Sequence, residues 1–144
     1  MWLILALSAA LIWGLDYVIA QKVFERNISP ITLLSVQMAL GAIALTLVGF
    51  YKGIWQRDFL LLFENSSARL YTSLAIVGFI VANVLIAFSI KGRNAVLAGI
   101  VEISYPLFIV LFSWLLFGTT YLSGATLVGA LLIAAGVLLI QFSA

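Results

Sequence analysis

Long apolar runs alternate with short polar breaks along the whole chain. A helix needs about 20 predominantly apolar residues to cross a hydrocarbon core of about 30 Å. Five runs of roughly that length follow one another and leave few residues between them. We therefore predict membrane-spanning helices at approximately residues 2–21, 31–51, 70–90, 95–117 and 124–142. The expected fold class is an all-α integral membrane protein, with residues 1–144 forming a single domain.

Signals at the ends of these runs refine the prediction. The first run contains Asp16 and has no basic residue before it, which favours a retained span over a cleaved signal peptide. The second follows Ser29 and Pro30, residue types that favour a helix start. The longest break, residues 52–69, carries apolar side chains at a spacing typical of a short helix in the membrane interface, which we place at residues 54–63.

Composition supports a membrane location and excludes several functions. The chain is 65% hydrophobic and only 8% charged, whereas soluble domains are about 45–50% apolar and about 25% charged. Cysteine and histidine are both absent, which excludes disulfides, thiolate or imidazole metal sites and Ser/His or Cys/His catalysis. We expect no enzyme activity, metal or cofactor. The net charge is only +2 and the seven basic residues are scattered, so the sequence does not indicate a nucleic-acid-binding surface.

The basic residues do not indicate one orientation in the bilayer. Basic residues near span ends normally concentrate on the cytoplasmic side. With five spans, one face would hold Lys52, Arg57 and Arg69, and the other Lys22, Arg26, Lys91 and Arg93. This even division has two interpretations: other determinants set the orientation, or the chain inserts both ways and pairs with an inverted copy of itself.

Strongly polar side chains within the spans lie at a common depth. At 1.5 Å per residue, Asp16 and Glu102 each lie about 10 Å from the same membrane face. The same count places Gln37 at about 9 Å and Asn83 at about 10 Å from that face. Because polar groups in hydrocarbon need partners or water, we expect four helices to face a shared cavity at this level.

The chemistry of this layer suits a hydrophobic cation or a proton. Trp13, Tyr17 and Tyr105 lie near the two carboxylates in sequence, and aromatic rings attract cations. A desolvated carboxyl can also load and release a proton. We therefore predict substrate or proton binding by Asp16, Glu102, Gln37, Asn83, Tyr105, Trp13 and Tyr17.

Structural roles remain open for each of these residues. The carboxylates could fix helix packing, the two amides could be interhelical hydrogen-bond partners, and the aromatic rings could be packing residues. Lys22 fits an interfacial anchor or a partner for a substrate anion. Pro106 predicts a kink, as a hinge or as a bend around a cavity.

The last predicted span carries small residues at a spacing that lets helices approach closely. Ala125, Gly129 and Gly136 are the candidate contacts with a second subunit. Packing within the same chain is the alternative.

Four segments, found in order along the chain, resemble an EamA-type domain of the drug/metabolite transporter superfamily. They are Ala10-Leu11-Ile12-Trp13-Gly14, Ile28-Ser29-Pro30, Tyr105-Pro106-Leu107-Phe108 and the segment from Gly129 to Val137. The resemblance covers essentially the whole chain and implies one five-helix repeat unit. Most relatives resemble two inverted copies of this unit in one chain, and smaller members of the superfamily work as antiparallel homodimers.

The resemblance implies export of small metabolites or toxic compounds by alternating access against a proton gradient. Two positions differ from the family pattern. Asp16 stands where the family commonly has Asn, which adds a charge to the site, and Thr119 follows Gly118 where the family has Glu.

Together these features predict a secondary transporter of small metabolites or organic cations in a bacterial or archaeal inner membrane. Its partners would be a small-molecule substrate, protons, the lipid bilayer and an inverted second copy that forms an antiparallel homodimer. The alternatives are a non-transporting half or subunit that needs a different partner, and a passive channel. A channel is disfavoured because no ring of like polar residues extends through the whole depth.

Overall fold

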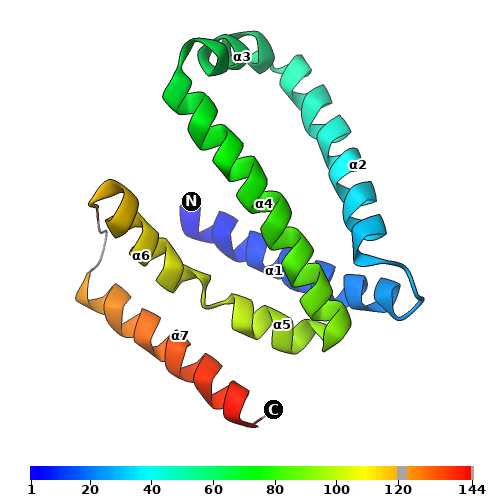
Figure 1. Cartoon of the computed structure of the whole chain (residues 1–144), viewed down its shortest axis with the longest axis vertical. Coiled ribbons are helices and arrows are strands. Elements are labelled where there is room, and N and C mark those ends of the chain that lie inside the picture. Colours follow the sequence, from blue (N-terminus) through cyan, green and yellow to red (C-terminus); the bar gives the residue numbers. More distant parts are fainter. Residues whose placement is uncertain (120–122, 144) are drawn as a thin grey trace.

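The computed structural model describes residues 1–119 and 123–143, and this part of the chain forms helices and no strands (Figure 1). The helices, in chain order, are α1 (Trp2–Phe24), α2 (Pro30–Tyr51), α3 (Ile54–Glu64), α4 (Ser66–Gly92), α5 (Ala95–Glu102), α6 (Tyr105–Phe117) and α7 (Gly124–Ser143).

Local sequence explains where several of these helices begin and end. The side chain of Ser29 accepts a hydrogen bond from the Ile31 amide at the start of α2, where Pro30 is the first helical residue. Asn65 and Asn94 cap α4 and α5 in the same way. Such caps satisfy amides that the first helical turn leaves without partners. Gly118 ends α6 with a positive φ of 63°, a backbone conformation that favours glycine.

The helices are long and apolar enough to form a multi-pass membrane protein. α1, α2, α4 and the segment Ala95–Phe117 each meet the length and hydropathy of a membrane span, and Gly124–Ile140 within α7 is a shorter apolar helix. The predicted all-α, five-span fold class is therefore confirmed. The observed helices extend the predicted spans by a few residues, most clearly for α1 and α4.

The fourth predicted span is interrupted. α5 ends at Glu102, a turn covers Ile103 and Ser104, and α6 begins at Tyr105. Proline lacks an amide hydrogen, so Pro106 cannot donate to the carbonyl of Glu102 four residues earlier. The Leu107 amide instead donates to Ser104 at 3.0 Å, a tighter turn than an α-helix makes. The kink expected from Pro106 is thus a break between two helices.

The helices converge at one end of the molecule and separate at the other. α2 and α4 diverge and are joined at their far ends by α3, while α1 and α5 pack beside the end of α4 (Figure 1). The buried hydrophobic core lies where α1, α4 and α5 meet and consists of Tyr17, Ala20, Phe24, Ala87, Ile90, Ala95 and Ala98. α6 and α7 pair with each other beyond the break. The core therefore supports α1 and α5, the two helices that carry the predicted carboxylates.

Candidate functional site

A direct hydrogen bond joins two of the predicted site residues across the helix interface. The hydroxyl of Tyr17 on α1 donates to Oε2 of Glu102, the last residue of α5, at 2.5 Å. Tyr17 is buried, and its ring lies against Gly99 one turn before Glu102 on the same helix. Trp13 packs on Tyr17 edge to face, with ring centroids 5.7 Å apart. The Glu102 carboxylate is therefore held at a defined place beside an aromatic pair.

The second carboxylate has its own partner on a different helix. Nε2 of Gln37 on α2 donates to Oδ1 of Asp16 at 3.2 Å. Asp16 is half-buried, whereas Gln37 is exposed in the single chain. Because Asp16 and Tyr17 are consecutive on α1, they point in directions about 100° apart around a helix of 3.6 residues per turn. Asp16 therefore links α1 to α2, and Tyr17 links α1 to α5.

Two predicted site residues lie outside these hydrogen-bonded pairs. Nδ2 of Asn83 donates to the carbonyl of Phe79 within α4 at 2.8 Å, a bond inside its own helix. Tyr105 opens α6 beyond the break and is 56% exposed. Two interhelical contacts thus join predicted site residues, Asp16 with Gln37 and Tyr17 with Glu102. Any binding role of Asn83 and Tyr105 stays a prediction.

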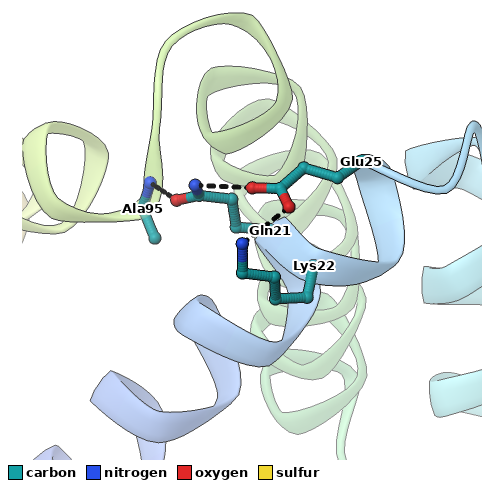
Figure 2. A network of polar contacts seen from close by, with 4 residues as sticks. All are labelled: Gln21, Lys22, Glu25 and Ala95. Atoms are coloured by element: carbon teal, nitrogen blue, oxygen red, sulfur yellow. Dashed lines mark hydrogen bonds and ion pairs between the residues drawn. The ribbon is translucent and has the colours of Figure 1, made fainter.

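Gln21 forms a polar connection that the sequence reasoning missed. Its Oε1 accepts a hydrogen bond from the amide of Ala95, the first residue of α5, at 2.8 Å, and its Nε2 donates to Glu25 at 3.1 Å (Figure 2). Nζ of Lys22 binds the other oxygen of Glu25 at 2.7 Å. These hydrogen bonds, first that from Lys22, hold the pKa of Glu25 below its usual range. Lys22 is therefore engaged at the helix end.

Two hydrogen bonds between α1 and α5 attach α5 at both of its ends. Gln21 holds Ala95 at the start of α5, and Tyr17 holds Glu102 at its end. The positions Tyr17 and Gln21 are four residues apart, so they lie on one face of α1. The four-residue spacing indicates a polar face on α1, but the sequence alone does not say which helix contacts that face. α5 is consequently aligned with α1, and the break follows immediately after Glu102.

The last helix presents its small residues to open space within the single chain. Gly129 and Gly136 are half-buried, but a Cβ atom added at either would meet no atom of another helix within 4 Å, and Ala125 is exposed. The α6–α7 pairing therefore leaves these positions available.

The carboxylates do not form a larger acidic cluster. In the described ranges, 1–119 and 123–143, no three Asp, Glu, His or Cys side chains are grouped as ligands for a metal ion. The arrangement can instead accept protons or a positively charged group at two carboxylates bordered by aromatic rings.

Comparison with known proteins agrees with this architecture. The sequence matches the EamA-like transporter family over residues 1–142. Searches of curated proteins and of solved structures returned no match. The family match covers nearly every residue, including α1, α2 and α5 with their paired polar side chains, and the chain therefore belongs to the EamA-like transporter family.

Proposed function

We propose that the chain is the subunit of a secondary active transporter that exports small organic cations or amine-bearing metabolites from a bacterial or archaeal cell in exchange for protons. The observation that carries this proposal is the pair of intramembrane carboxylates, Asp16 and Glu102, each bound to a polar side chain of a neighbouring helix. Ionisable groups within spans are costly to insert, by roughly 2.5–3.5 kcal/mol on insertion scales, and commonly mark transport pathways.

The surroundings of the carboxylates favour a cation over other small molecules. Trp13 and Tyr17 form an edge-to-face aromatic pair next to Asp16 and Glu102. Aromatic rings attract cations through their negative faces, and a carboxylate supplies the compensating charge. No basic side chain hydrogen-bonds to either carboxylate among the described residues. An incoming ammonium group or a proton would supply the missing positive charge.

Competition for one carboxylate, which we assign to Glu102, provides the coupling. A proton and a substrate cation neutralise the same negative charge, so binding of one disfavours binding of the other. Alternating exposure of the site to the two sides of the membrane then exchanges substrate for protons. The interruption after Glu102 supports such a change of exposure, because broken helices line the binding sites of many transporters near the bilayer midplane.

We further propose that two copies pair in inverted orientation to form the working transporter. The single chain leaves Gln37 exposed beside a half-buried Asp16, and polar groups facing lipid carry a large cost. An inverted copy would cover this side. The even division of basic residues between the two faces and the open small residues of α7 support the same arrangement.

Ligand binding to the purified protein tests the site across several classes of compound. Thermal unfolding is followed in detergent in the presence of a panel of amines, amino acids and nucleosides. We expect amines to raise the midpoint through preferential binding to the folded state. Asp16→Asn should weaken this shift, whereas Asp58→Asn on α3 should leave it unchanged. A panel in which only uncharged compounds stabilise the protein, or an Asp16→Asn protein with an undiminished amine shift, would contradict the proposal.

A further inference from the structure

A second, chemically different site lies at the corner between α2 and α3, away from the carboxylates. Thr46, Phe50, Trp55, Gln56 and Phe59 line an open hollow with a volume of about 450 Å³. This volume lies within the range of about 300–1,000 Å³ that is typical of small-molecule sites. The lining contains no charged side chain, and its exposed surface is almost entirely apolar.

Trp55 is fixed in place by two features of α2. Its Nε1 donates a hydrogen bond to the carbonyl of Thr46 at 3.0 Å. Its indole covers Gly49, where an added Cβ would come within 2.1 Å of Nε1 and 2.7 Å of Cδ1. Such distances leave no room for a side chain, so glycine permits the close approach of the ring. The hollow therefore has a defined wall, held by α2.

Aromatic rings continue from this wall along α3. Phe50 and Trp55 lie with centroids 6.3 Å apart, Trp55 and Phe59 stack at 4.9 Å, and Phe59 and Phe63 stack at 6.3 Å. The result is a continuous row of ring faces from the end of α2 across α3. A flexible apolar chain can lie along such a row, whereas a cation in the hollow would find no carboxylate in the lining.

Basic side chains outnumber acidic ones at this corner. Residues 52–69 carry Lys52, Arg57 and Arg69 against Asp58 and Glu64. Arg57 binds Asp58, and Arg69 donates to the carbonyl of Phe63. Lys52, in the turn between α2 and α3, takes part in no ion pair with the residues that the structure describes. Its ammonium group is available for an external anion at the end of a membrane span.

We propose that this corner binds an anionic phospholipid, with one acyl chain in the hollow along the row of aromatic rings and the phosphate beside Lys52. A span end next to an amphipathic helix lies at the level where lipid tails meet headgroups. Basic residues near this level attract anionic lipids. The proposal is independent of transport, since it involves neither Asp16 nor Glu102.

Fluorescence quenching of Trp55 tests this proposal directly. Trp2, Trp13 and Trp114 are replaced by Phe, which leaves Trp55 as the single tryptophan of the chain. The protein is reconstituted into phosphatidylcholine vesicles that contain a small, equal fraction of either brominated phosphatidylglycerol or brominated phosphatidylcholine. We expect about fivefold more effective quenching by the anionic lipid, which corresponds to the attraction of one basic residue near a charged surface.

Two substitutions provide the matched comparison. Lys52→Gln should remove the preference for the anionic lipid, and Lys91→Gln at the opposite end of α4 should retain it. Equal quenching by both lipids in the single-tryptophan protein that retains Lys52 would overturn the proposal. The absence of quenching by both lipids would also overturn it, because it would mean that a second copy covers the hollow. Displacement of the brominated lipid by tetraphenylphosphonium would do the same, because it would mean that the hollow takes cations.

Discussion

At the scale of single residues, α1 supplies the centre of the candidate site. Asp16 and Tyr17 are neighbours in sequence, yet they contact different helices because successive residues point about 100° apart around a helix axis. One helix can thus hold a carboxylate of its own and position a second carboxylate on α5. The hydroxyl of Tyr17 is the group that binds the Glu102 carboxylate.

Removing this hydroxyl should destabilise the protein by a measurable amount. In Tyr17→Phe the ring and its contact with Trp13 remain, but the partly buried Glu102 loses its donor. We expect a loss of about 1–2 kcal/mol in the free energy of unfolding, the size of an interhelical hydrogen bond to a carboxyl group. Denaturation in mixed detergent micelles measures it. Tyr51→Phe, on a 93% exposed ring, is the control, and an equal loss in both variants would contradict the assigned role.

Sequence reasoning grouped these residues by depth but did not predict all of their partners. Counting 1.5 Å per residue placed Asp16, Gln37 and Glu102 at one level, and the structure brings Asp16 and Gln37 together. The direction in which a side chain points around its helix depends on how that helix is rotated by packing. For this reason the count by depth did not predict that Asn83 bonds to its own helix. Gln21 was passed over as the end of a span, although it binds the first amide of α5.

At the scale of elements, α5 depends on its neighbours. It has 8 residues, fewer than the roughly 20 that a helix needs to cross a bilayer on its own. Its two hydrogen bonds to α1 and its packing in the core therefore fix its position. The break leaves α6 outside this arrangement. Pro106 marked the interruption in the sequence, but a proline alone does not distinguish a kink from a full break.

Restoring the missing amide should join the two helices. In Pro106→Ala, residue 106 gains an N–H that can donate to the carbonyl of Glu102, so the turn at Ile103 and Ser104 can become helical. We expect amide hydrogen exchange over residues 103–107 to slow by about fivefold, equivalent to about 1 kcal/mol for one backbone hydrogen bond.

The other proline provides the matched control. Pro30 occupies the first position of α2, where a missing N–H costs little. Pro30→Ala should therefore leave exchange over residues 103–107 unchanged. If Pro106→Ala also leaves this exchange unchanged, the break has another cause than the proline.

At the scale of the whole molecule, the proposed transporter requires a second, inverted copy. The chain contains no cysteine, so a single introduced thiol reports on one position. Ser67→Cys, at the start of α4, and Lys91→Cys, at its end, mark opposite faces of the membrane. In intact cells, a membrane-impermeant maleimide should label a substantial part of each variant from outside. Labelling of only one of the two variants would establish a single orientation and contradict the inverted pair.

In the proposed transport cycle, Glu102 carries the proton that exchanges with the amine. The most direct measurement records the internal pH of proteoliposomes loaded with a pH-sensitive dye after addition of an amine that binds the protein. The unsubstituted protein should change the internal pH as amine and proton exchange, and Glu64→Gln, on exposed α3, should do the same. We expect Glu102→Gln to fold with an unchanged helical circular dichroism spectrum and to produce no pH change. A pH change in Glu102→Gln at the same rate as in the unsubstituted protein would contradict this role of Glu102.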